Sequence, residues 1–183
     1  LEAGHEKSLP YQDDFSTDKG WIQDWGGARM TPDGLAVSAE VDTSGASVYL
    51  DGTYTWRDYT MNADIIWIDG EAVSLVARHQ KDTDFIACTY TKNFVVLDQT
   101  TNGKKERIAE SRFASPLEYG RTSLGISVVG KKIRCLRDSK EVLAYEDPGA
   151  GLKTGGIGFK LWSSRLGQSR AVVSGVRVTH ETP

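Results

Sequence analysis

The chain has 183 residues, of which 39% are hydrophobic, and its 22 Lys and Arg against 25 Asp and Glu give a formal net charge of −3. This length suits one domain with one core. The acidic balance argues against nucleic acid as a partner, because proteins that bind it use excess positive charge to attract phosphates. No apolar run approaches the roughly 20 residues that cross a bilayer, so membrane insertion is not expected.

Apolar residues recur with a period of two along most of the chain, which is typical of strands. Ten strands are predicted, at residues 48–50, 60–67, 72–78, 84–91, 93–98, 123–129, 132–137, 141–145, 156–162 and 171–179. Asp69-Gly70 and Asn102-Gly103 are among the pairs between them that favour tight turns. So many strands in one domain need two stacked sheets, because a single open sheet would leave an apolar face in water.

The predicted fold is therefore an all-β, two-sheet antiparallel sandwich that spans residues 11–180 as a single domain. Residues 1–10 are expected to be an N-terminal tail or linker. The chain begins at Leu1 rather than Met, and we expect it to be part of a larger multidomain protein.

Several short segments follow one another in an order that is typical of one fold family. They are 11–16 (YQDDFS), 20–21 (GW), 56–65 (WRDYTMNADI), 74–80 (SLVARHQ), 84–90 (DFIACTY), 130–136 (GKKIRCL) and 155–162 (GGIGFKLW). In order and spacing the chain resembles the concanavalin A-like, laminin G-like domains of bacterial secreted proteins and of galactocerebrosidase. The resemblance runs from Tyr11 to Val178. It implies a jelly roll whose concave sheet or loop rim meets carbohydrate, although function varies widely on this fold.

The same resemblance raises the question of a calcium ion. Domains of this kind often have a Phe-Asp-Asp-like segment before the last strand, whereas residues 172–175 here are VVSG, which weakens a calcium proposal. The remaining source of hard oxygen ligands is Asp13 with Asp14, and a structural calcium ion held there is the only cofactor considered. The alternative is that these acids cap the first strand and keep a sheet edge soluble.

Catalysis on the same fold is an alternative that the residues support poorly. Glycosidases need two carboxyl groups roughly 5 to 9.5 Å apart, and the nearest alternation of acids, residues 67–71 (WIDGE), has Trp where the first acid should be. A polysaccharide lyase would use groups such as Arg78, His79 and Tyr90. However, adjacent strand residues such as Arg78 and His79 point to opposite faces. No catalytic residue is therefore assigned.

Strand alternation also predicts a binding surface. In residues 156–162, one face carries Ile157, Phe159 and Leu161 and is expected to be core. Lys160 and Trp162 then point outward together, and alternation along residues 72–78 places Arg78 on the solvent side of a sheet. Exposed aromatic rings offer flat apolar platforms for pyranose rings, with polar groups fixing their orientation. The predicted ligand-binding residues are Arg78, Lys160, Trp162, Tyr90 and Trp25.

The two cysteines each lie in the middle of a predicted strand. An even number of cysteines in an extracellular domain permits a disulfide between Cys88 and Cys135. The alternative is that they are two small buried hydrophobic residues that never meet. The bridge is the interpretation that we favour.

These observations predict a non-catalytic, lectin-like carbohydrate-binding module of a secreted or cell-surface bacterial protein, with a glycan or polysaccharide as its partner. A glycoside hydrolase or polysaccharide lyase on the same sandwich is the first alternative. A structural or protein-interaction module is the second.

Overall fold

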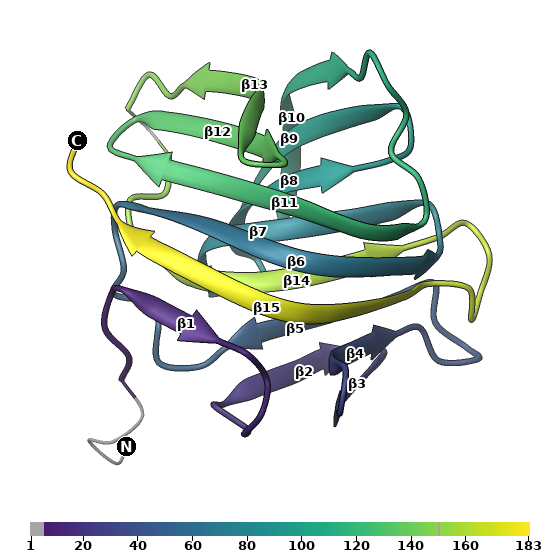
Figure 1. Ribbon diagram of the computed structural model, residues 1–183. Coiled ribbons are helices and arrows are strands. Elements are labelled where there is room, and N and C mark those ends of the chain that lie inside the picture. The colour runs from purple at the N-terminus through teal and green to yellow at the C-terminus, as the bar shows by residue number, and fades with distance from the viewer. Residues whose placement is uncertain (1–5, 150) are drawn as a thin grey trace.

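The computed structural model describes residues 6–149 and 151–183, and every regular element in this part of the chain is a β-strand. The strands form two sheets that pack face to face, and Figure 1 shows the eight-stranded sheet in front of the seven-stranded one. All strand pairs are antiparallel, as in β6 with β11 and β15. The predicted two-sheet jelly-roll sandwich is confirmed. No segment of the described chain forms a helix long and apolar enough to span a membrane.

The eight-stranded sheet contains β1 (Tyr11–Asp13), β3 (Gly27–Thr31), β4 (Gly34–Ser38), β6 (Tyr59–Asp69), β11 (Gly120–Val129), β12 (Lys132–Arg137), β13 (Lys140–Glu146) and β15 (Arg170–His180). Its order is β13-β12-β11-β6-β15-β4-β3, and β1 pairs with β15. The seven-stranded sheet contains β2 (Trp21–Trp25), β5 (Gly45–Leu50), β7 (Ala72–Lys81), β8 (Asp84–Tyr90), β9 (Phe94–Thr101), β10 (Lys104–Arg112) and β14 (Gly156–Trp162). Its order is β10-β9-β8-β7-β14-β5-β2.

One face of each sheet is apolar, and the two apolar faces meet to form the core. Along β6, every second side chain from Met61 to Trp67 is buried in this core. Leu75 of β7 and Phe159 of β14 are buried in the same cluster from the opposite sheet. Burial of such side chains is the main favourable contribution to folding. The side chains on the outer faces do not form this core, so they can serve roles other than packing.

Polar and covalent contacts connect the two sheets through this core. Cys88 of β8 and Cys135 of β12 form a disulfide, with their Cα atoms 5.8 Å apart. The Tyr90 hydroxyl, also on β8, donates to Gly125 O at 2.6 Å across the sandwich. In the opposite direction, the Tyr59 hydroxyl of β6 donates to Gly155 O at 2.8 Å. The sheets are therefore tied at several separate points.

The predicted N-terminal tail is docked wherever the structure describes it. Trp56 Nε1 donates to Lys7 O at 2.8 Å, and Lys7 N donates to Gly52 O at 2.8 Å. Leu9 packs against the core cluster. Residues 6–10 are thus an ordered part of the sandwich, and residues 1–5 lie outside the described residues.

Candidate functional site

The outward residues of β14 lie where strand alternation predicted them. Phe159 and the other inward residues of β14 are buried in the core, whereas Trp162 is 49% exposed on the opposite face. The neighbours of Trp162 on the two adjacent strands are Gly45 of β5 and Ala72 of β7. Neither neighbour has a side chain large enough to cover an indole. The ring is therefore left open to solvent on the outer face of the seven-stranded sheet.

The centre of this outer face is hollowed rather than flat. Its floor consists of small or β-branched side chains, which are nearly inaccessible although the described residues form no third layer above them. These floor residues are Ser74, Val76, Ala87 and Val96. Low exposure without a covering layer means that larger side chains rise on either side of a trough. A trough of this kind can hold an elongated ligand against the sheet.

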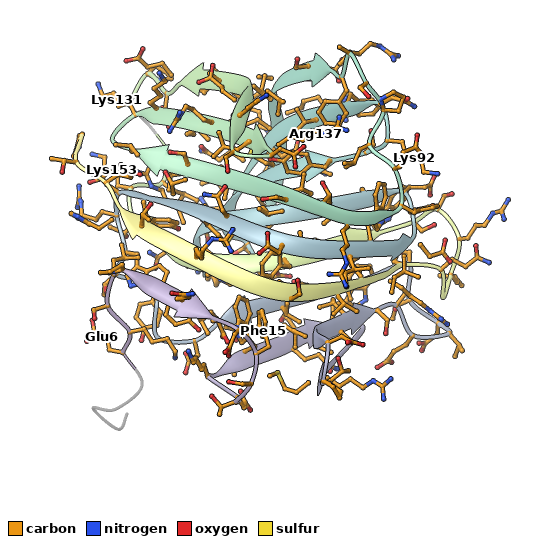
Figure 2. All side chains as sticks on the ribbon, viewed as in Figure 1. Glu6, Phe15, Lys92, Lys131, Arg137 and Lys153 are labelled. Carbon is orange, nitrogen blue, oxygen red and sulfur yellow. A yellow bond between two sulfur atoms is a disulfide. The ribbon has the colours of Figure 1, made fainter. Side chains whose placement is uncertain are left out.

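The trough deepens into a cavity of about 700 Å³ between β14 and β10. Trp162 forms one wall, and Asp98, Lys105 and Arg107 of β9 and β10 contribute charged groups. Lys92, which Figure 2 labels near one end of the sandwich, also lines the cavity, and its Nζ lies 3.8 Å from the centre of the Tyr119 ring. Ligand pockets typically measure roughly 300 to 1,000 Å³. The volume suits a ligand the size of a short oligosaccharide.

Asp98 is the most deeply placed charged group of the cavity. Its side chain is on the outer side of β9, because Val95 and Leu97 point into the core. Asp98 is only 4% exposed, and Lys105 Nζ lies 3.5 Å from its Oδ2. Burial raises the pKa of Asp98, while the charges of Lys105 and Arg107 act to lower it. The ionised form of Asp98 is thus less well stabilised by its surroundings than that of a carboxyl group on the surface.

Lys160 lies further along the same face and is already engaged. Its Nζ donates to Asp82 Oδ1 at 2.7 Å and to Ser47 Oγ at 2.9 Å, and lies 4.7 Å from the centre of the Phe85 ring. Asp82 also interacts with Asp24, whose pKa is raised by burial and by the hydrogen bond with Asp82. Lys160 therefore fixes a polar cluster beside the trough, and the same face carries both Lys160 and Trp162.

The predicted position of Arg78 is wrong. The β7–β8 register shifts between Ala77 and Lys81, and Arg78 has a positive φ of 47°. Such a bulge inserts an extra residue and reverses the alternation beyond it. Arg78 is consequently 4% exposed, and its guanidinium donates to the carbonyl oxygens of Arg57, Leu152 and Gly130. Its role in the structure is to hold loops together, away from Trp162.

The same bulge turns His79 to the outer face in place of Arg78. The His79 ring stacks on Tyr49 with 4.9 Å between ring centroids, and Phe85 lies 6.1 Å away on the other strand. Burial lowers the pKa of His79 to about 4, and the positive charge of Lys160 acts in the same direction. The neutral imidazole is therefore part of a row of rings beside the Lys160 cluster.

Tyr90 does not lie on the ligand-facing surface either. Its side chain points into the core, where it is completely buried, and its hydroxyl donates to the Gly125 and Leu136 carbonyl oxygens and accepts from Leu136 N. Burial raises the pKa of the phenol, so the group stays protonated. Tyr90 shares its strand face with Ile86 and Cys88, both of which are core residues, so strand alternation itself argues against Tyr90 as a ligand-binding residue.

Trp25 lies on the outer face, on edge strand β2. The β2–β5 register pairs it with Ser47, the residue that accepts from Lys160. Its indole is 41% exposed and lies so close to Gly45 that an added Cβ there would be 3.0 Å from the ring. Gly45 is also the β5 partner of Trp162. One glycine thus neighbours both exposed indoles.

The carboxylates of Asp13 and Asp14 do not fit a calcium site. Asp13 Oδ2 accepts from the Tyr11 hydroxyl and Trp21 Nε1, both at 2.8 Å, and Asp13 Oδ1 accepts from Phe15 N. Asp14 Oδ1 accepts from the backbone and side chain of Ser16. Calcium would need six to eight oxygens free of such donors. Among the described residues, moreover, no three His, Cys, Asp or Glu side chains cluster in a way that could hold a metal.

Asp69 ends β6, and Glu71 lies in the connection from β6 to β7. Gly70 N donates to Asp69 Oδ1 at 2.8 Å. The Glu71 carboxylate accepts from Ser163 Oγ at 3.2 Å and from Ser164 N, and the Ser164 hydrogen bonds lower the pKa of Glu71. Asp69 thus serves the local turn, whereas Glu71 links this connection to the loop that follows β14 and also lines the cavity.

No protein-family model and no curated protein sequence matches the chain. Among solved structures, the carbohydrate-binding module CBM66 from Bacillus subtilis matches with a TM-score of 0.73 and 20% identity, over 87% of this chain and 95% of that one. The fold is that of a concanavalin A-like jelly roll. The apo Crh5 transglycosylase matches with a TM-score of 0.70 and 14% identity, over 96% of this chain and 86% of that one. The VIP36 exoplasmic/lumenal domain in its Ca2+/Man3GlcNAc-bound form follows with a TM-score of 0.69 and 12% identity, over 89% of this chain and 84% of that one.

This jelly roll presents charged residues at its cavity that the sequence had not singled out. Asp98, Lys105 and Arg107 come from β9 and its neighbour β10. Alternation within residues 93–98 already separates Asp98 from Val95 and Leu97, so a signal for its outward direction existed. That it lines the same cavity as Trp162 depends on the strand order, which no local pattern reveals.

Proposed function

We propose that this protein binds a glycan in the cavity beside Trp162, as a non-catalytic carbohydrate-binding module. The observation that carries the proposal is the exposed indole of Trp162, which forms a wall of a cavity of about 700 Å³ that also contains charged hydrogen-bonding groups. An aromatic face is the natural partner of the apolar C–H face of a pyranose ring, and the polar groups select its hydroxyl pattern.

The chemistry of the cavity favours binding over hydrolysis. A sandwich-fold glycosidase needs two carboxyl groups that face one scissile bond. Along the outer face of β9, the residues flanking Asp98 are Val96 and Thr100, and its partners on β8 and β10 are Ala87 and Arg107. None of these four neighbours is an acid. The other acid that lines the cavity, Glu71, already accepts hydrogen bonds from Ser163 Oγ and Ser164 N, so Asp98 has no free carboxyl partner there for either glycosidase mechanism.

The structural neighbours support a carbohydrate ligand without naming it. One is described as a carbohydrate-binding module and another as a domain bound to Man3GlcNAc. The Crh5 transglycosylase shows that the same architecture also occurs in an enzyme. The lectin-like interpretation therefore depends on the residues of the cavity more than on these likenesses.

We further propose that the parent is a multidomain secreted or cell-surface protein. The disulfide between Cys88 and Cys135 supports this, because such bonds form and persist mainly in oxidising compartments. A catalytic or anchoring domain in the same protein would supply the enzymatic activity or the surface attachment that a binding module by itself lacks.

The test is a glycan array with the wild-type protein and the Trp162→Ala variant, followed by titration calorimetry on each hit. We expect Trp162→Ala to weaken binding at least tenfold, as is usual for a tryptophan at the centre of an interface. Tyr54→Ala is the matched control, because Tyr54 is also 49% exposed but does not line the cavity. It should leave affinity unchanged.

A reducing-end assay on each hit separates binding from turnover. New reducing ends that disappear in Asp98→Ala would replace this proposal with a glycoside hydrolase. If the wild-type protein binds no glycan, the carbohydrate function is wrong, and a structural or protein-interaction module becomes the better account.

A further inference from the structure

The Asp98 carboxylate has an oxygen that no group in the protein satisfies. Among the described residues, only Asp98 Oδ1 and Asn62 Oδ1 are buried side-chain polar atoms without a hydrogen-bond partner. Buried acceptors in native proteins are almost always paired, and each exception calls for an explanation. Burial of a charged group without full pairing is especially unfavourable.

The two unpaired oxygens have different surroundings. Asn62 Oδ1 lies against backbone, since a Cβ added to Gly125 on the neighbouring strand would come within 2.7 Å of it. Asp98 instead lines the cavity that contains Trp162. A ligand that enters the cavity can therefore supply the missing donor to Asp98.

The groups around Asp98 form a donor and acceptor set. Lys105 Nζ, next to Asp98 Oδ2, is a donor at the rim, and Arg107 is the direct β10 partner of Asp98. Both cationic side chains are more than half exposed, whereas Asp98 is buried. A carboxylate oxygen accepts hydrogen bonds and the two cations donate them. Adjacent hydroxyl groups of a sugar can meet both requirements at once, because each can donate and accept.

We propose that Asp98 is the specificity-determining residue of the site: its Oδ1 accepts a hydrogen bond from a hydroxyl group of a neutral oligosaccharide, another unit of which stacks on Trp162. This inference rests on the proposed glycan-binding function. It adds the ligand class, a neutral sugar with adjacent free hydroxyl groups, and excludes sugars whose recognised ring carries a carboxylate or sulfate.

The preference for a neutral sugar follows from the burial of the Asp98 charge. A ligand carboxylate near Asp98 would place a second negative charge beside one that is already poorly solvated, which is consistent with the raised pKa of Asp98. Attraction from Lys105 and Arg107 cannot offset this, because exposed cations are screened by water and salt. A sugar hydroxyl, in contrast, provides the donor that the buried oxygen lacks.

The substitution Asp98→Asn tests this idea with little change in shape. A hydrogen bond to a charged group contributes roughly tenfold to hundredfold in affinity, and we expect a loss of that size for a neutral oligosaccharide hit. Because the substitution also removes a partly unpaired buried charge, the unliganded variant should melt at the same temperature as wild type or higher. A residue with a purely structural role would instead lower the melting temperature and leave affinity unchanged.

Asp84→Asn is the matched control on the neighbouring strand. Asp84 is also buried, but its Oδ1 accepts from Asn102 N at 3.0 Å and its Oδ2 from Thr83 Oγ1 at 2.9 Å. These hydrogen bonds hold the pKa of Asp84 below its usual range. The same substitution there should lower the melting temperature and leave glycan affinity unchanged.

The experiment combines calorimetry on neutral cello-, manno- and xylo-oligosaccharides and on oligogalacturonides with thermal melts of the four proteins: wild type, Trp162→Ala, Asp98→Asn and Asp84→Asn. Neutral binding that is lost in both Trp162→Ala and Asp98→Asn supports the inference. If Trp162→Ala loses binding but Asp98→Asn retains it, or if oligogalacturonides bind best, this inference is overturned while glycan binding stands. Absence of binding to every probe and array glycan overturns both.

Discussion

The Tyr90 hydroxyl offers the sharpest test of which residues support the fold and which face the ligand. Tyr90→Phe removes one oxygen atom and leaves the ring in place, so it creates no large cavity. The hydroxyl lies 2.6 Å from Gly125 O and 2.8 Å from Leu136 O, and it accepts from Leu136 N at 3.0 Å. With phenylalanine, that amide and at least one carbonyl lose a partner in a fully buried region.

The size of the effect follows from these contacts. A hydroxyl donates one proton, so Tyr90 makes about two full hydrogen bonds, one donated and one accepted. A buried group left without its partner costs about 1–3 kcal/mol. We therefore expect Tyr90→Phe to lower the free energy of unfolding by about 3 kcal/mol, a large share of the 5–15 kcal/mol typical of a domain.

Urea unfolding followed by tryptophan fluorescence measures this change. With an m-value of roughly 2 kcal/mol per molar for a domain of this size, the midpoint should fall by about 1.5 M. Tyr119→Phe is the control, because its hydroxyl makes one hydrogen bond, to Gly70 O at 2.9 Å, at a partly exposed position where water can replace it. That loss should stay below about 1 kcal/mol. A loss below 1 kcal/mol for Tyr90→Phe, or a weakened glycan affinity, would refute the structural role assigned to Tyr90.

Three further predictions concern the disulfide, His79 and Trp25. Replacing both Cys88 and Cys135 by Ala should lower the free energy of unfolding by about 4 kcal/mol in the chain-entropy model, since the bridged residues are 47 apart in sequence; urea unfolding checks this, and a loss under 1 kcal/mol would contradict it. The pKa of His79 is about 4 in the folded protein and 6.5 for the free side chain, so the unfolded chain binds more protons between these pH values. The free energy of unfolding should therefore decrease as the pH falls from about 6.5 toward 4, by up to about 3 kcal/mol. His79→Phe keeps the ring stack with Tyr49 and Phe85 but removes the titration, so its unfolding free energy should fall less steeply over this pH range than that of wild type, and parallel curves would count against the assignment. Because Trp25 and Trp162 both neighbour Gly45, Trp25→Ala should weaken the binding of longer oligosaccharides several-fold and leave the binding of the shortest ligand unchanged. Calorimetry with oligosaccharides of increasing length tests this. Equal losses of affinity at every length would show that Trp25 does not extend the site.

The strands that sequence patterns missed are mainly those at the sheet edges. β2, β3 and β10 are edge strands, and their side chains are mostly exposed or half-buried. An edge strand is held by backbone hydrogen bonds to one neighbour, so it does not need an apolar face. The ten predicted strands are all present in the two sheets. Most of them alternate between core and solvent residues, which is why the sequence pattern identified them.

The same limits explain the outcome for the candidate site. Local alternation was sufficient to place Trp162 and Lys160 on one outer face, because β14 keeps a regular pattern from Ile157 onward. It failed at Arg78, because the apolar pattern does not reveal the bulge that shifts the strand register there. Asp98 and Trp162 line one cavity although β8 and β7 separate β9 from β14 in the sheet, and such long-range strand order is not readable from single segments.

Strand β8 shows how this architecture separates stability from recognition. Its inward residues, Cys88 and Tyr90, bind the two sheets together through a disulfide and buried hydrogen bonds. Its outward residues, Ala87 and Thr89, lie on the face that forms the trough, one residue away along the chain. Because adjacent strand residues point to opposite faces, a change at an outward position can alter the ligand surface and leave the cross-sheet contacts intact. This separation accounts for a fold shared by proteins only 12–20% identical to this chain, one described as a binding module, one as a transglycosylase and one as a Man3GlcNAc-bound domain. It also predicts that Tyr90→Phe and Trp162→Ala will act on different quantities, the first on unfolding free energy and the second on glycan affinity.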